Sequence, residues 1–182
     1  MKKITARDLA ETGVFAALVF AASGIRFVIP LAVGNTAIHL GNVLCILSGL
    51  LLGGIRGGLA AGIGSCFYDL TNPLYVASSP FTLAFKFCIG FITGKIAYAH
   101  GRNGINKRFN ILGAILGSLA YIVLYLGKTF VSSLIVKGLS VPMAALMTAQ
   151  SGVASLLNGL IAVACAVPLA FGIRLALRRR RM

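Results

Sequence analysis

The segment GNVLCILSGLLLGGIRGGLAAGIGSCFYDL, residues 41–70, decides how this chain folds. It is apolar along most of its length, but Gly53-Gly54-Ile55-Arg56-Gly57-Gly58 places four glycines around one arginine at its centre. A glycine inside a helix costs about 1 kcal/mol relative to alanine, so this hexapeptide is a poor helix centre. The segment therefore predicts two short helices, over 42–55 and 57–70, joined by a tight turn.

The composition of the whole chain indicates a membrane protein. Of its 182 residues 58% are hydrophobic and 11% are charged, whereas soluble domains carry about 25% charged residues. A membrane-spanning helix needs about 20 apolar residues, and several runs approach that length. We expect an all-α, six-helix transmembrane bundle that forms a single integral membrane domain over residues 1–182. The expected helices cover 9–30, 42–55, 57–70, 81–99, 111–133 and 147–175.

The basic residues predict the orientation. With six crossings and a cytoplasmic N-terminus, thirteen of the 17 lysines and arginines fall on the cytoplasmic side or at helix ends that face it. The exceptions are Arg26, Lys86, Lys128 and Lys137. Cytoplasmic loops of membrane proteins are enriched in such bases, which contact anionic lipid head groups. We expect the chain to span a bacterial cell membrane with both termini in the cytoplasm, and we expect no binding of nucleic acid.

Polar residues at membrane depth concentrate toward the predicted outer side. Such residues are costly in hydrocarbon and usually face the bundle interior, so together they predict a cavity open to the exterior. The candidate substrate-binding residues are Asn35, His39, Asn42, Asp69, Asn72, Tyr75, Ser79, Lys86, Tyr125, Lys128, Gln150 and Asn158. Arg26, Ser78 and Tyr121 lie on the same side.

Each of these residues also has a simpler interpretation. Arg26 and Lys86 are long enough to reach the outer head groups, and Asp69 is a candidate ion-pair partner for Lys86 or Lys128. Tyr75 fits an interfacial aromatic belt, and Asn158 fits a hydrogen bond between helices. The clustering on one side is therefore better evidence for a site than any single member.

Catalysis is poorly supported by the sequence. The acidic residues are only Asp8, Glu11 and Asp69, and the chain contains no HExxH or GxSxG motif. The four cysteines show no CxxC spacing, so we expect no metal and no cofactor. A membrane enzyme acting on a lipid or prenyl substrate remains an alternative, although it would normally need clustered Asp, Glu or His. A structural or assembly protein is another, but it would not need the outer polar cluster.

Several motifs give the chain a resemblance to a known family. They are Ile38-His39-Leu40-Gly41-Asn42, Leu50-Leu51-Leu52-Gly53, Gly57-Gly58-Leu59-Ala60-Ala61-Gly62-Ile63-Gly64-Ser65, Tyr68-Asp69-Leu70, and Pro80-Phe81-Thr82 followed by Lys86 and Gly90. Over roughly residues 5–175 the chain resembles the substrate-binding S components of energy-coupling factor (ECF) vitamin transporters, in the riboflavin-type branch. Ala17 and Ala21 are similar to the AxxxA motif by which S components dock on the coupling subunit.

The resemblance implies a six-helix subunit, without enzymatic activity, that binds its vitamin from outside. It implies association with a transmembrane coupling subunit and two ATPases, and toppling of the subunit in the membrane. Within this branch a hydroxymethylpyrimidine-like or pyridoxine-like ligand is favoured; the alternatives are riboflavin or an anionic vitamin such as pantothenate. Relatives carry an acid where this chain has Asn42, which leaves the substrate open. Arg26, Lys86 and Lys128 fit a carboxylate or phosphate, and the amides and hydroxyls fit a pyrimidine or pyridine alcohol.

Overall fold

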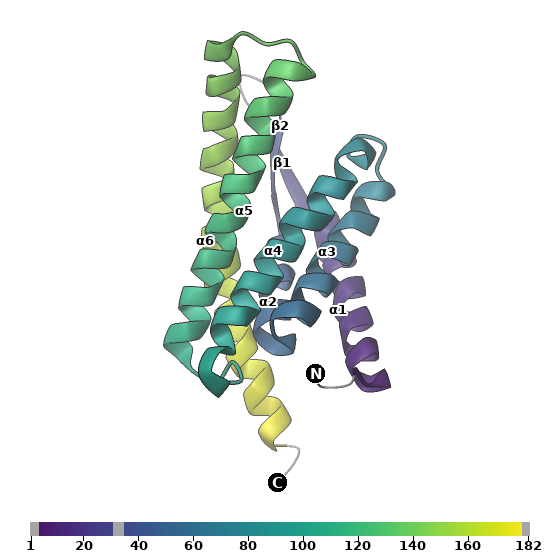
Figure 1. Ribbon diagram of the computed structural model, residues 1–182, viewed down its shortest axis with the longest axis vertical. Coiled ribbons are helices and arrows are strands. Elements are labelled where there is room, and N and C mark those ends of the chain that lie inside the picture. Colours follow the sequence, from purple (N-terminus) through teal and green to yellow (C-terminus); the bar gives the residue numbers. More distant parts are fainter. Residues whose placement is uncertain (1–3, 31–34, 180–182) are drawn as a thin grey trace.

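The computed structural model describes residues 4–30 and 35–179, without the side chains of 28–30 and 35–38. In this part of the chain the fold is a bundle of six α-helices that alternate in direction, so that both chain ends lie at one end of the molecule (Figure 1). The helices are α1 (Ala6–Gly24), α2 (Gly41–Leu52), α3 (Gly54–Leu70), α4 (Ser79–Ala97), α5 (Lys107–Ile135) and α6 (Val141–Arg179). Short 3-10 turns, η1 (Val76–Ser78) and η2 (Ala99–Gly101), precede and follow α4.

The glycine-rich centre of residues 41–70 forms the predicted turn. Gly53 separates α2 from α3 and has a φ of +85°, a backbone conformation that glycine adopts without steric cost. Glycines also bring α2, α3 and α4 into backbone contact. A Cβ on Gly57 would lie 2.5 Å from the Gly49 Cα, and a Cβ on Gly90 would lie 2.5 Å from the Gly57 carbonyl oxygen. Small residues at such spacing allow close helix packing in lipid.

The first helix is shorter than predicted, because it ends at Gly24 rather than at residue 30. The chain continues as a β-hairpin in which β1 (Arg26–Pro30) pairs antiparallel with β2 (Asn35–His39). Phe27-Val28-Ile29 favours a strand, and Pro30 cannot donate a helical hydrogen bond. An apolar run this short does not distinguish helix from strand by its pattern alone. Pairing of the two strands satisfies backbone groups that apolar surroundings would leave unbonded.

Three of the described helical segments are long and apolar enough to cross a membrane by length and composition. They are Val76–Ala97, Lys107–Ile135 and Val141–Arg179. The 12 residues of α2 rise only about 18 Å and the 17 residues of α3 about 26 Å, against a hydrocarbon core of about 30 Å. The prediction of six complete crossings therefore stays a prediction.

Charged side chains hold the helices together at the end where the termini lie. Arg56 of α3 donates a hydrogen bond to Asp8 and lies 3.5 Å from a Glu11 carboxylate oxygen, which links α3 to α1. Arg174 of α6 donates to the Leu50 carbonyl at 2.6 Å and to the Tyr98 hydroxyl at 3.1 Å. These contacts join α6 to the end of α2 and to the end of α4.

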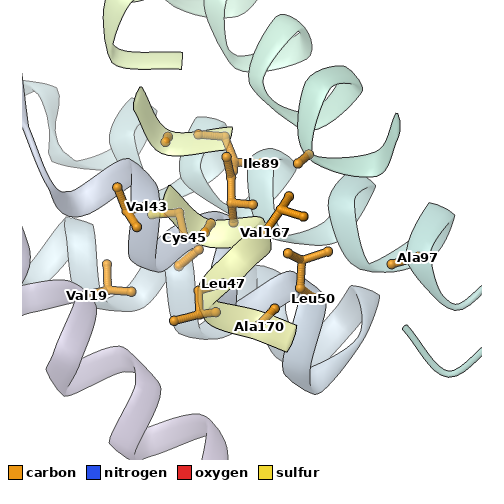
Figure 2. Close-up of a cluster of buried hydrophobic side chains, with 14 residues drawn as sticks. Val19, Val43, Cys45, Leu47, Leu50, Ile89, Ala97, Val167 and Ala170 are labelled. Carbon is orange, nitrogen blue, oxygen red and sulfur yellow. The ribbon is translucent and has the colours of Figure 1, made fainter. Parts of the chain in front are cut away.

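The middle of the bundle is filled by apolar side chains that interlock between α2, α4 and α6 (Figure 2). The fully buried Ile46 and Leu50 lie one and two helical turns from Asn42 in α2. In α6, Ala162 and Ala166 follow Asn158 at the same spacing and are also fully buried. The polar residues beyond this core therefore pack directly against it.

The glycine contacts give a test of the packing. Gly90→Ala would place a methyl group 2.5 Å from a backbone oxygen, and overpacking of this kind typically costs about 1–3 kcal/mol. We expect a lower midpoint of thermal unfolding for the variant purified in detergent. Gly172→Ala is the matched control, because its Cβ would meet nothing within 4 Å and alanine favours a helix. Equal loss of stability in both variants would contradict the packing described for Gly90.

Candidate functional site

A polar cavity of about 310 Å³ lies at the end of the bundle opposite the termini. All six helices and both strands contribute to its lining, through the ends of α1 and α3, the starts of α2 and α4, the second half of α5 and the first half of α6. The lining residues are Ser23, Arg26, His39, Asn42, Tyr68, Asp69, Tyr75, Ser78, Phe81, Thr82, Phe85, Lys86, Tyr121, Tyr125, Lys128, Ser155 and Asn158.

Most of the predicted site residues meet in this cavity. Those found in its lining are His39, Asn42, Asp69, Tyr75, Lys86, Tyr125, Lys128 and Asn158. Asn72, Ser79 and Gln150 are not part of the lining, and the side chain of Asn35 lies outside the described residues. Asn72 accepts a hydrogen bond from the Leu74 amide at 3.1 Å, and Ser79 donates to the Val76 carbonyl at 2.8 Å. Both side chains therefore stabilise the connection between α3 and α4.

Lys86 is the most deeply placed charged residue of the cavity. It is only 5% exposed, and its ammonium group donates a hydrogen bond to the side-chain oxygen of Asn42, which is 3% exposed. The same ammonium lies 4.2 Å from the centre of the Tyr121 ring, which stacks on Tyr125 at 5.7 Å. With its charge held inside the bundle, Lys86 does not reach for the outer head groups.

The β-hairpin is tied to the helices on two sides of the cavity. The His39 amide donates to the side-chain oxygen of Asn158 in α6 at 3.0 Å. The guanidinium of Arg26 lies between two aromatic rings, 4.5 Å from the centre of Tyr68 and 4.7 Å from that of Tyr75. It also donates to the Ser23 carbonyl at 3.2 Å. The hairpin is thus fixed by neutral and aromatic partners.

The other two charged residues of the lining also have neutral partners. The Lys128 ammonium donates to the Ser78 hydroxyl at 3.0 Å, and the Asp69 carboxylate accepts from the Thr82 hydroxyl at 2.5 Å. Among the described residues Asp69 forms no ion pair with a lysine or arginine. Its interpretation as the counter-ion of Lys86 or Lys128 is therefore not supported.

His39, at the end of β2, is neutral near pH 7. Burial lowers the pKa of the imidazole well below its usual range, and the charges of Lys86 and Arg26 lower it further. Its buried Nδ1 has no hydrogen-bond partner among the described residues. A neutral imidazole offers one donor and one acceptor nitrogen, so His39 can hydrogen-bond to a bound molecule without adding charge.

Sequence reasoning missed several lining residues: Ser23, Tyr68, Phe81, Thr82, Phe85 and Ser155. Helical spacing was the signal that would have found two of them. Thr82 precedes Lys86 by four positions and Ser155 precedes Asn158 by three, so each lies near the same face of its helix as the predicted residue. The apolar and hydroxyl side chains carried no charge to draw attention to them.

A second hollow of about 410 Å³ lies near the termini. Its lining consists of Ile105, Phe171, Arg174, Leu175, Leu177 and Arg178, from α6 and the connection before α5. The polar side chains of its lining are those of two arginines, and Arg174 already donates hydrogen bonds to backbone carbonyls. The described residues also contain no group of His, Cys, Asp or Glu that could hold a metal ion. The polar cavity is therefore the candidate site.

Comparison with known proteins defines the class of this chain. The sequence profile of the ECF-type riboflavin transporter S component matches residues 3–175, and the chain belongs to this family. Family membership and the long apolar helices together indicate a multi-pass membrane protein. The resemblance seen in the sequence is confirmed at the level of the family.

A protein of Pyrococcus woesei, described only as uncharacterized and encoded in a gap 3' region, is 27% identical over 103 residues. The match covers 57% of this chain and 66% of that protein, just under two thirds of its length. It adds a relative but no information on the ligand.

The rings around Arg26 give a test of how the hairpin is fixed. Tyr75→Ala removes one face of the aromatic pair, and a cation–π contact contributes about 0.5–1 kcal/mol at an exposed site. We expect amide hydrogens of Arg26–Ile29 to exchange about two- to fivefold faster, as measured by hydrogen–deuterium exchange. Tyr75→Phe keeps the ring face, so in this variant the same amide hydrogens should exchange at the wild-type rate. Equal exchange in all three proteins would show that Tyr75 does not hold the hairpin.

Proposed function

We propose that this S component captures a small water-soluble vitamin or vitamin precursor in the polar cavity, from outside the cell. It then delivers the ligand together with a transmembrane coupling subunit and two ATPases. The observation that carries the proposal is that polar side chains from all six helices converge on one cavity, which borders the apolar core. Ligand pockets are typically concave, partly apolar and furnished with a few convergent polar groups.

The proposed orientation puts the cavity outside and both termini in the cytoplasm of a bacterial cell, with six passages through the membrane. The alternating helix directions and the shared end of the termini support this arrangement (Figure 1). Basic residues near the termini support it further, since the helix ends there carry Arg7, Lys95, Lys107, Arg178 and Arg179.

Three kinds of ligand fit the family and the lining. A hydroxymethylpyrimidine-like or pyridoxine-like molecule, favoured by the branch that the sequence resembles, would be bound by Asn42, Asn158 and the tyrosines. An anionic vitamin such as pantothenate would use the lysines, and riboflavin, the molecule in the family's description, is the third possibility. Tyr121 and Tyr125 offer ring faces to any of them.

We also propose that Ala17 and Ala21 form the surface that docks on the coupling subunit. Both side chains are exposed on α1, and Gly13 continues the row of small residues at the same four-residue spacing. Small side chains at this spacing let a helix of another subunit approach closely.

Binding and uptake measured side by side test this function. Ala17→Trp should abolish uptake of a radiolabelled vitamin by cells that contain the coupling subunit and ATPases, because the indole would hold the partner helix away. Binding of the same vitamin by the purified subunit should stay within about twofold of wild type. Leu160→Trp, at an exposed apolar position of α6, is the control and should preserve both activities. Loss of binding together with uptake in Ala17→Trp would contradict the docking role.

The orientation is tested by cysteine accessibility in a variant whose four native cysteines are replaced by serine or alanine. Lys107→Cys, at the start of α5, should react with a membrane-impermeant maleimide only after the membrane is permeabilised. Ser140→Cys, in the connection before α6, should react in intact cells. Both positions are exposed, so a cysteine at either one should escape labelling only if it lies on the side of the membrane that the maleimide cannot reach. The reverse labelling pattern would overturn the proposed orientation.

A further inference from the structure

We infer that the ligand carries a negative charge, as a carboxylate or a phosphate, and that this group binds at the cations of the cavity, chiefly Lys86 and Lys128. The inference rests on the proposed function and adds the substrate class to it. It comes from the charges of the lining and from the partners that each charge has.

The lining is rich in positive charge. Arg26, Lys86 and Lys128 face the cavity, and Asp69 is the only acid there. The chain has just three acidic side chains, and the other two, Asp8 and Glu11, are bound to Arg56 near the termini. The protein therefore places one acidic side chain, Asp69, against three basic ones in the lining of the cavity.

Among the described residues none of the three cations forms an ion pair with a carboxylate. Lys86 has an amide and a tyrosine ring, and Lys128 has the Ser78 hydroxyl. Arg26 has two tyrosine rings and a backbone carbonyl. The one carboxylate of the site is bonded to Thr82 rather than to any of them. Hydrogen bonds and ring faces orient these cations, and the single carboxylate of Asp69 leaves the lining with an excess of positive charge.

Uncompensated charge inside a membrane protein is expensive, since removing an ion from water costs several kcal/mol unless an opposite charge repays it. An anionic ligand supplies that charge, whereas a neutral ligand only replaces one set of hydrogen bonds by another. Lys86 is nearly completely buried, so its ammonium does not extend to the outer surface of the bundle. The half-buried Lys128 lies in the lining of the same cavity as Lys86.

The rest of the lining indicates what the remainder of the ligand is. Phe81, Phe85 and the stacked pair Tyr121–Tyr125 provide apolar and ring surfaces, and Asn158 and the neutral His39 provide hydrogen bonds. This combination fits a small molecule with an acidic group at one end and a less polar body. Of the ligand classes above, it favours the anionic vitamin over the neutral pyrimidine and pyridine alcohols.

Titration calorimetry on the purified subunit tests this inference. The anionic probes are pantothenate, nicotinate and biotin, and the neutral probes are panthenol, hydroxymethylpyrimidine, pyridoxine and riboflavin. We expect the tightest binding from an anionic probe, and pantothenate, if it is that probe, should bind at least tenfold more tightly than its alcohol panthenol. Tightest binding by a neutral probe would overturn the inference and leave the proposed function standing. Binding of no probe would contradict the proposed function itself.

Two variants ask whether the named cations recognise the charge. Asn42→Asp is nearly isosteric and would give Lys86 a carboxylate of the protein's own, and Lys128→Gln removes the second charge. Each should weaken binding of the anionic probe at least tenfold while the midpoint of thermal unfolding confirms that the variant is folded. Lys95→Gln removes an equal charge from the exposed, opposite part of α4 and should leave the affinity unchanged. Unchanged affinity in both cavity variants, or equal loss in Lys95→Gln, would overturn the assignment.

Discussion

The constraint on which this structure depends is that hydrocarbon forms no hydrogen bonds, so every polar group within the bundle needs a partner in the protein or in its ligand. Lys86 shows how the chain satisfies this constraint. Its buried ammonium group donates a hydrogen bond to the Asn42 side chain and lies over a tyrosine ring. The hairpin satisfies the same constraint through strand pairing and through the Asn158 side chain. Polar groups that must share partners are drawn together, and the cavity forms where they meet.

Much of this arrangement could be predicted from the sequence because its causes are local. Glycine clustering at Gly53–Gly58 places a helix break, and the break is found at Gly53. Charged and amide residues at membrane depth, such as Lys86 and Asn158, are costly enough to mark the site. The hairpin after Gly24 could not be predicted in the same way, because its strands are short and stable only through pairing with each other.

The hydrogen-bond partners of the side chains in the site could not be predicted from the sequence either. Asp69 has a charge opposite to that of Lys86 and Lys128, yet its hydroxyl partner Thr82 lies on the following helix. The rotation of each helix and the side-chain rotamers decide whether a charged group lies next to an opposite charge or a neutral group. The periodicity of the sequence specifies neither of them. Asn72 and Ser79 were expected at the site for their polarity, but their hydrogen bonds are made to the neighbouring backbone.

The central claim is that the ligand of this S component binds in the cavity between the hairpin and the second half of α5. A structure of the subunit purified with its bound vitamin, solved by crystallography or by electron microscopy with a rigid binding partner, tests it most directly. We predict ligand density in contact with Lys86, Tyr125 and Asn158. Density in the hollow lined by Phe171 and Arg174, with the polar cavity unoccupied, would contradict the account.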